Sequence, residues 1–331
     1  MIRRWILVAS TLLILAGCAT GSEPAGTGGA PGAGGAPGTA GAPGTGGTAA
    51  GCATDIGVGE VQPFAMPTPT RTEGITFDAA GRLFVSALAD DPDDDQLLEV
   101  MLDGTHEVAA EAESILGIAS HPTGIIAAGI RTGDILRIDP DTGDSEVIVN
   151  VGDEPNFVVI TPWDTILVSD DGEDEGVGRE TIREVTFDGD VSVWVEGVPT
   201  PNGMVFSLDG RTLYVAATFG VDRGLWRVPV SEDGLASVPE KWTDLGGLPT
   251  PDGVAIDSEG NVYVAANIAG QIAQVAPDGS FTVIAEGVET VASLAFGRGE
   301  RDPCSIYATN LFGDAPPQLW RVGIGIPGPE Q

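Results

Sequence analysis

The feature that most constrains the fold is a unit of about 45 residues that recurs along the chain after residue 52. In GITFDAAGRLFVSA, GMVFSLDGRTLYVAA and GVAIDSEGNVYVAA, two apolar strands flank a turn that contains Asp or Gly. Two further strands follow, as in QIAQVAPDGS and FTVIAEG. The units start near Gly74, Gly117, Phe157, Gly203, Gly253 and Leu294, at intervals of 40 to 50 residues. The sequence therefore predicts an all-β, six-bladed β-propeller with four-stranded blades over residues 52–328.

The last repeat ends near Gly328, which leaves little room for a fourth strand. We expect the N-terminal segment VGEVQPFAM (58–66) to supply the outer strand of that blade and close the ring. Cys52 would then lie beside the blade that contains Cys304. A disulfide that fastens the closure is the prediction, and two free thiols are the alternative.

The N-terminus reads as a targeting signal. Two arginines precede an apolar run that is too short to span a bilayer and that ends in Leu15-Ala16-Gly17-Cys18. This ending resembles the bacterial lipobox, and an ordinary secretory signal is the alternative. The resemblance implies that residues 1–17 are a signal peptide and that Cys18 is lipidated. Residues 18–51, rich in Gly, Ala, Pro and Thr, are predicted to form a flexible linker.

These features predict a lipid-anchored protein of the bacterial cell envelope. Ala19 rather than Asp follows the lipobox cysteine, which favours the outer membrane, on its periplasmic or surface face. Two or more acyl chains make such anchoring stable. We expect contact with the membrane only through this anchor, and a monomer.

The charge balance narrows the possible partners. The chain carries 49 acidic and 15 basic side chains, a net charge of −34, which argues against nucleic acid as a partner. Two histidines and three cysteines leave little room for zinc, haem or iron–sulfur ligation. The sequence lacks a P-loop and a G-x-S-x-G nucleophile elbow. A hard cation such as calcium remains a possible ligand.

The residue that opens each inner strand can point at the propeller axis. Carboxylate or carboxamide oxygens occupy four of these six positions, and two of the four lie in the similar segments PTPNG and PTPDG. Each segment alone is a common turn sequence. Together they predict an axial site for Ca²⁺, or another divalent cation, because such ions prefer oxygen ligands. The six expected positions are Glu73, Leu116, Asn156, Asn202, Asp252 and Ser293.

At these residues the chain resembles the SMP-30/gluconolactonase/LRE-like family of calcium-dependent propeller lactonases. The likeness runs from Glu73-Gly74 through PNG and PDGVAIDSEGNVYVA to AFGRGERDPCSIYATN. It implies that Glu73, Asn202 and Asp252 hold the catalytic metal, and that Asn156 lies near metal and substrate.

Two departures from the family concern the substrate. Members that open sugar lactones often carry Arg two residues before the third-blade Asn and Asp after it. Here Glu154 and Phe157 occupy these positions, which predicts a different, more apolar substrate contact. Asp170 matches an acidic position of some relatives and is a candidate acid or base, with a solvated turn as the alternative.

Hydrolysis of a lactone or related ester is the leading hypothesis. The metal would polarise the carbonyl, and Asp252 or Asp170 would take a proton from the attacking water. The alternative is a non-enzymatic envelope propeller in which calcium is structural and the loops bind a partner.

Overall fold

The computed structural model describes residues 52, 55–66, 71–91, 94–152, 154–170, 181–311 and 319–329. The chain divides into two compact units, Met1–Gly46 and Gly47–Gln331, and every described residue belongs to the second. The predicted signal peptide (1–17), the lipidation site Cys18 and the linker up to residue 51 lie outside the described residues. Within the described ranges, no helix is long and apolar enough to cross a membrane.

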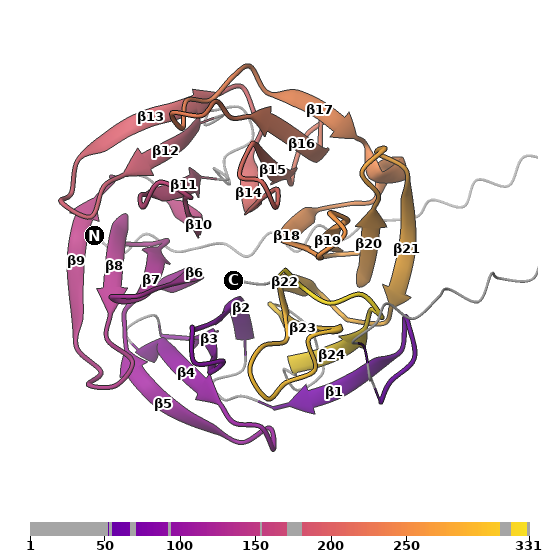
Figure 1. Ribbon diagram of the computed structural model, residues 1–331. Coiled ribbons are helices and arrows are strands. Elements are labelled where there is room, and N and C mark those ends of the chain that lie inside the picture. The colour runs from indigo at the N-terminus through magenta and orange to yellow at the C-terminus, as the bar shows by residue number, and fades with distance from the viewer. Residues whose placement is uncertain are drawn as a thin grey trace, which may run out of the picture. The chain divides into compact units, whose positions relative to one another are not determined.

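Six four-stranded antiparallel sheets are arranged in a ring around a central axis, as Figure 1 shows, and this confirms the predicted six-bladed β-propeller. Within each blade, the chain runs outward from the axis by successive hairpins. The one exception is the sixth blade, whose outer strand comes from the N-terminal part of the chain. A short 3₁₀ helix, η2 (Leu245–Gly247), follows the outer strand of the fourth blade.

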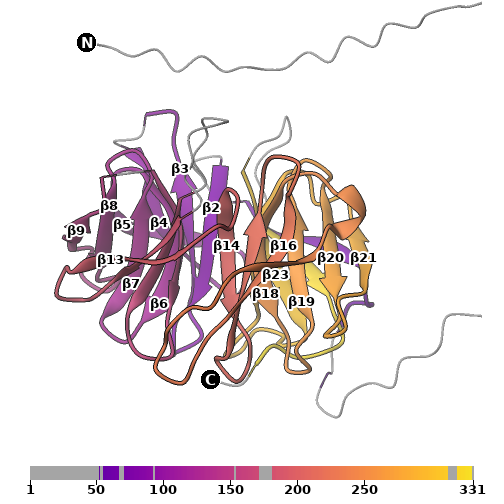
Figure 2. The same cartoon turned by 90° about the horizontal axis from the view of Figure 1, so that it is seen from above.

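The strands form four concentric layers around the axis (Figure 1). Figure 2 shows the ring edge-on, with the strands running from one face to the other. The inner layer consists of β2 (Arg71–Phe77), β6 (Ile115–His121), β10 (Pro155–Ile160), β14 (Pro201–Phe206), β18 (Pro251–Ile256) and β22 (Val291–Phe296). The second layer consists of β3 (Leu83–Leu88), β7 (Gly124–Gly129), β11 (Ile166–Asp170), β15 (Thr212–Ala217), β19 (Val262–Ala266) and β23 (Ser305–Asn310). The third layer consists of β4 (Gln96–Val100), β8 (Asp134–Ile138), β12 (Thr181–Val185), β16 (Gly224–Pro229), β20 (Gln271–Val275) and β24 (Leu319–Gly323). The outer layer consists of β5 (His106–Glu111), β9 (Ser145–Asn150), β13 (Val191–Glu196), β17 (Glu240–Thr243), β21 (Phe281–Glu286) and β1 (Val61–Ala65).

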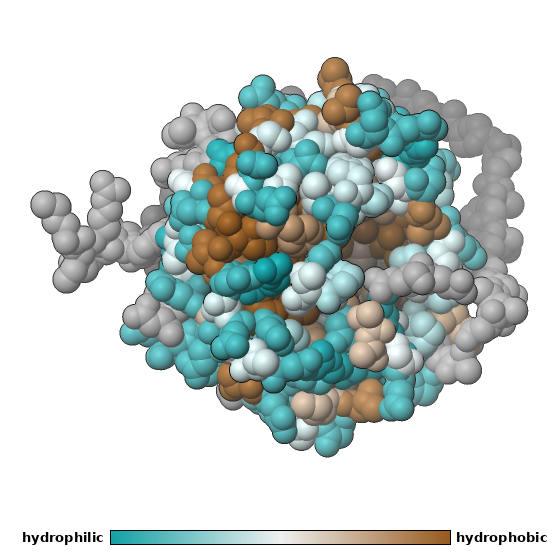
Figure 3. Space-filling model, turned by 60° about the vertical axis from the view of Figure 1, so that its left-hand side comes forward, coloured by the Kyte–Doolittle hydropathy of each residue, from teal (hydrophilic) through white to brown (hydrophobic). Residues whose placement is uncertain are grey.

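The hydrophobic core lies between the blades. Second-layer strands such as β3 and β19 are buried along their whole length, because both faces of their sheets pack against neighbouring blades. Each of six clusters of buried apolar side chains spans two adjacent blades. Buried and exposed residues alternate less regularly along the outer strands, where Val147, Val191 and Val193 are exposed. The face in Figure 3 accordingly shows hydrophobic side chains gathered among hydrophilic ones.

The first and last parts of the chain close the ring, as the sequence predicted. Strand β1 pairs with β24 in the sixth blade, with Val61 opposite Val322. A disulfide joins Cys52 to Cys304, whose Cα atoms are 5.8 Å apart, and this also agrees with the prediction. It links residues 252 positions apart in the sequence, so the ring is fastened covalently at its closure.

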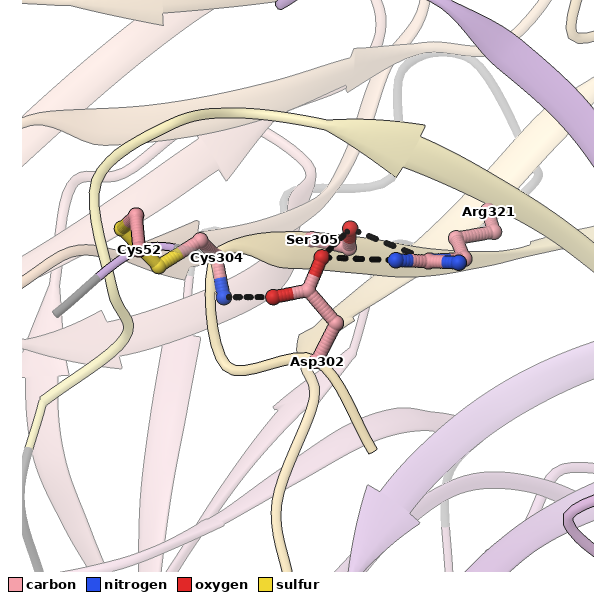
Figure 4. Close-up of a disulfide and its surroundings, with 5 residues drawn as sticks. All are labelled: Cys52, Asp302, Cys304, Ser305 and Arg321. Carbon is pink, nitrogen blue, oxygen red and sulfur yellow. Dashed lines mark hydrogen bonds and ion pairs between the residues drawn. A yellow bond between two sulfur atoms is a disulfide. The ribbon is translucent and has the colours of Figure 1, made fainter. Parts of the chain in front are cut away.

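A charged cluster stands beside this disulfide (Figure 4). The Asp302 carboxylate accepts hydrogen bonds from Cys304 N at 3.0 Å and Ser305 Oγ at 2.6 Å, and pairs with Arg321 at 2.7 Å. Arg321 also pairs with the exposed Asp55, and its guanidinium lowers the pKa of that carboxyl. The cluster therefore connects the segment after Cys52 to blade six by ion pairs as well as by the disulfide.

Candidate metal centre

Every inner strand contains a β-bulge near its N-terminal end. The pairing of β2 with β3 shifts register between Thr72 and Ile75, and that of β18 with β19 shifts between Pro251 and Val254. The other four blades have the same irregularity at the same place. A bulge releases residues from the ladder and redirects their side chains. In each blade, one residue is the first that the bulge releases from the ladder. We call these six residues together the axial ring: Glu73, Leu116, Asn156, Asn202, Asp252 and Ala292.

Close contacts between neighbouring inner strands bring the six bulges together. Consecutive inner strands contact each other around the ring, including β22 with β2 (Figure 1). A Cβ atom added to Gly203 would collide with the backbone of Asp252 and Gly253, so glycine is required for this approach. All six axial-ring residues are buried. The structure thus gathers Glu73 and Asp252 with the two asparagines at one end of the channel.

The sixth axial position is Ala292, so the sequence-based choice of Ser293 was wrong by one residue. The register of β22 against β23 gives Ala292 the place that Asp252 has in β18. Backbone conformation agrees, because Thr290 and Thr250 both have positive φ (48° and 45°) and each precedes its axial residue by two positions. Ser293 occupies the position that glycine holds in four other blades, and without that glycine the apolar pattern can be aligned one residue late.

Hydroxyl groups of the second layer fix the axial ring from behind. In blades one, three and six, a Ser or Thr side chain donates a hydrogen bond to the carbonyl of the next blade's axial residue. The bonds run from Ser86 Oγ to Leu116 O (2.6 Å), from Ser169 Oγ to Asn202 O (2.8 Å) and from Thr309 Oγ1 to Glu73 O (2.5 Å). Because these donors are buried and lie on continuous strands, the axial backbone is held rigidly.

The axial ring has the chemistry of a site for a hard cation. Glu73 and Asp252 are carboxylates with only 3% and 6% exposure, and burial of charge is costly unless an opposite charge compensates it. The buried Oδ1 of Asn202 accepts no hydrogen bond from the described residues, so its lone pairs remain for a ligand. Two carboxylates and two amide oxygens suit Ca²⁺, which also accepts water, better than zinc, which prefers nitrogen and sulfur.

The composition of this set also explains a negative finding. Within the described ranges, no group of three or more His, Cys, Asp or Glu side chains is arranged to hold a metal ion. The axial ring contains only two such residues, Glu73 and Asp252, and its other oxygen donors are asparagines. The residues present fit a cation that accepts amide oxygens.

Asn267 is a site residue that the sequence reasoning missed. It directly follows β19, is buried, and donates a hydrogen bond from Nδ2 to Oδ2 of Asp252 at 3.0 Å. The corresponding residue of blade four, Thr218, donates to the carbonyl of Pro251 at 2.7 Å. In blades four and five, the residue after the second strand therefore supports the inner layer, and alignment of these two strand ends would have pointed to Asn267.

Asp170 lies next to the axial ring, on the second strand of blade three. It belongs to a set of six second-strand residues, one in each blade, that pair with the residue preceding the axial-ring residue, and we call this set the adjacent tier. It is the last residue of β11, is 8% exposed, and stands opposite Pro155, the neighbour of Asn156. The corresponding positions of the other blades hold Ala87, Gly129, Ala217, Ala266 and Asn310. Asp170 is thus the one carboxylate of this tier in the described chain, and it lies beside the candidate metal centre.

The two predicted substrate contacts lie on different sides of the axial ring. Glu154 is half-buried and precedes Asn156 by two residues. It therefore lies at the end of the channel where the axial ring is found, which we call the entrance. The side chain of Phe157 packs in the core cluster that includes Met204. Phe157 also lines an apolar cavity of about 310 Å³ formed by the C-terminal ends of the inner strands, at the other end of the channel. This geometry places Glu154 beside the entrance and Phe157 away from it.

Fold and site together define a six-bladed propeller with an axial oxygen-donor centre. Residues 71–303 match the sequence profile of the SMP-30/gluconolactonase/LRE-like region. The chain belongs to this family.

Individual relatives agree with this assignment. The chain is similar to the pentonolactonase XacC of Haloferax volcanii, with 29% identity over 218 residues, 64% of this chain and 72% of the relative. It is also similar to a gluconolactonase of Zymomonas mobilis subsp. mobilis, with 26% identity over 185 residues, 49% of this chain and 51% of the relative. A solved structure of a regucalcin from Agrobacterium tumefaciens, described as calcium-binding, matches with TM-score 0.68 and 22% identity over 81% of this chain and 94% of the other. This structural likeness concerns the fold.

Proposed function

We propose that the protein is a calcium-dependent lactonase whose reaction takes place at the axial ring. The observation that carries the proposal is the burial of two carboxylates and two carboxamides, from Glu73, Asp252, Asn156 and Asn202, at one end of the channel. The lactonase names of two relatives support the same reaction class.

The residues divide the work between holding the cation and moving a proton. Glu73, Asn156, Asn202 and Asp252 would hold Ca²⁺, or another divalent cation. Such an ion polarises an ester carbonyl and stabilises the negative charge that develops on its oxygen. The protein provides the rigid backbone behind these side chains, so the donors need little reorganisation during the reaction.

We assign the general base to Asp170 rather than to Asp252. Asp252 accepts a hydrogen bond from Asn267 and serves the cation, and both interactions stabilise its ionised form and weaken it as a base. Asp170 is a buried carboxylate in the adjacent tier, within the third blade. It would accept the proton of the attacking water and return it to the ring oxygen that leaves when the lactone opens.

The first experiment is an assay of the purified protein with aldonolactones, alkyl lactones and aryl esters, in calcium and in EGTA. We expect hydrolysis of at least one lactone in calcium, and loss of both this activity and calcium binding in Asp252→Ala. Asp278→Ala is a matched control, because Asp278 lies in an exposed turn of the same blade. Hydrolysis by wild type in EGTA would contradict the metal mechanism. Calcium binding without hydrolysis of any lactone would instead favour a structural role for the ion.

A second experiment separates the base from the ligands. Asp170→Asn keeps the size of the side chain but cannot accept a proton, so kcat should fall by about 100-fold or more while the calcium affinity is retained. An equal loss of calcium binding would instead make Asp170 a ligand, and unchanged kcat would return the role of base to Asp252.

We further propose the lipid-anchored envelope location that the lipobox-like sequence predicts. The disulfide supports it, because disulfides persist in oxidising compartments such as the periplasm and the cell surface. The test is metabolic labelling with a radioactive fatty acid. The wild-type chain should be labelled and fractionate with membranes, and Cys18→Ser should abolish both results.

A further inference from the structure

Two large apolar side chains stand exposed at the same position of blades four and five, beside the candidate metal centre. Phe219 and Ile268 each lie two residues beyond the last residue of the second strand, and are 38% and 71% exposed. Val221, in the same loop as Phe219, is 93% exposed. Isolated exposed hydrophobic residues are normal on protein surfaces. Recurrence at one position of two adjacent blades is the feature that requires an explanation.

The backbone holds both residues in a fixed relation to the site. Phe219 N donates to Thr200 Oγ1 at 2.8 Å, and Ile268 N donates to Thr250 Oγ1 at 2.9 Å. Each threonine has positive φ and precedes its blade's axial-ring residue by two positions. The residue before Ile268 is Asn267, which contacts Asp252 directly. Phe219 and Ile268 therefore flank the entrance above the axial ring.

The chemistry differs in blades one and two. The corresponding positions hold Ala89 and the exposed Arg131, and the Arg71 guanidinium donates to the carbonyl of Ala89 at 2.8 Å. The corresponding residues of blades three and six, Gly172 and Phe312, lie outside the described ranges. Arg71 also pairs with the exposed Asp90 at 3.7 Å, so the described part of the entrance has charged groups of both signs over blades one and two. Over blades four and five it has the exposed apolar side chains of Phe219, Val221 and Ile268.

We infer that the substrate is a lactone with an apolar alkyl or acyl substituent, which lies over Phe219, Val221 and Ile268 while the ester group reaches the axial ring. This inference rests on the proposed function and specifies its substrate class. A polyhydroxylated sugar lactone would place hydroxyl groups against these apolar side chains, where they would lose hydrogen bonds to water. A hydrocarbon substituent would gain from leaving water at the same place.

The test is the dependence of kcat/KM on chain length, measured with γ-lactones that carry progressively longer alkyl groups and with an aldonolactone. In the wild type, kcat/KM should rise about three- to fourfold for each methylene that becomes buried, and the long-chain lactones should exceed the aldonolactone. The double variant Phe219→Ser/Ile268→Ser should reduce the ratio between the longest and the shortest lactone by at least tenfold. Leu208→Ser is the control, because Leu208 is 53% exposed in the turn at the opposite end of blade four.

Each outcome has a distinct meaning. A flat chain-length profile together with faster hydrolysis of the aldonolactone would overturn the inference and leave the proposed lactonase intact. A steep profile that the double variant leaves unaltered would also overturn it, because the apolar contact would then lie elsewhere. Failure to hydrolyse every lactone in the presence of calcium would overturn the proposed function, and this inference with it.

Discussion

The Nδ2 atom of Asn267 donates a hydrogen bond to Oδ2 of Asp252 at 3.0 Å, so a residue outside the axial ring fixes the orientation of a carboxylate within it. Asn267 is itself buried and also reaches the carbonyl of Thr290 in blade six. The amide thus connects the fifth and sixth blades behind the candidate metal centre. Side chains that orient metal ligands in this way are important for affinity in other metal sites.

Asn267→Ala should weaken calcium binding by about tenfold or more, because a hydrogen bond to a charged group is worth about 1.5–3 kcal/mol. Calcium titration by calorimetry measures the effect. Asn261→Ala is a matched control, since Asn261 makes the same kind of bond, at 2.7 Å, to Asp257 in the same blade but away from the axial ring. Equal calcium affinity in wild type and Asn267→Ala would refute a positioning role.

Loss of the disulfide should destabilise the propeller without altering its site. Cys52→Ser should lower the free energy of unfolding by about 2–5 kcal/mol, because the cross-link restricts a long loop of the unfolded chain. Thermal unfolding of wild type with and without reductant should show the same difference. If the oxidised, reduced and variant proteins melt together, the pairing of β1 with β24 alone closes the ring.

The three tyrosines predict loss of stability at alkaline pH. Burial raises the pKa of Tyr263, Tyr214 and Tyr307 above the ordinary value, so the folded state disfavours tyrosinate. An unfolded tyrosine ionises near about pH 10. The stabilisation is therefore complete below this pH and is lost progressively as the pH rises above it.

Tyrosinate absorbance and near-ultraviolet circular dichroism, followed together during alkaline titration, test this expectation. The absorbance should rise only as the dichroism of the folded state disappears. Between neutral and alkaline pH, Tyr263→Phe should lose less of its free energy of unfolding than the wild type loses. The reason is that the variant lacks the tyrosine whose pKa is raised most strongly. Complete ionisation near about pH 10 with the fold intact would contradict the expected coupling.

Much of the architecture could be predicted because the repeat is local and periodic. The segments PTPNG and PTPDG mark equivalent positions in two blades. They therefore predicted the axial positions of Asn202 and Asp252 correctly, since both residues lie in the bulges of their inner strands. The closing strand could be inferred because the last repeat lacked a fourth strand. The sixth axial position was missed because Ser293 replaces the glycine that marks the register elsewhere.

Other features depend on contacts that no local pattern reveals. The role of Asn267 follows from a hydrogen bond between the end of β19 and a bulge in β18, and its sequence context is that of an ordinary loop. Phe157 directly follows Asn156, yet its side chain packs toward the opposite end of the channel. The bulge determines which neighbours face the entrance, so adjacency in sequence was a poor guide to the lining of the site.

The central claim is that a cation held by the axial ring is required for lactone hydrolysis. The most direct measurement is the rate of lactone hydrolysis during calcium titration of protein stripped with EGTA, for wild type and Asp252→Ala. The account predicts that the wild-type rate rises saturably from background as calcium is added, and that Asp252→Ala stays at background throughout. Full activity of the stripped wild type before any calcium is added would contradict it.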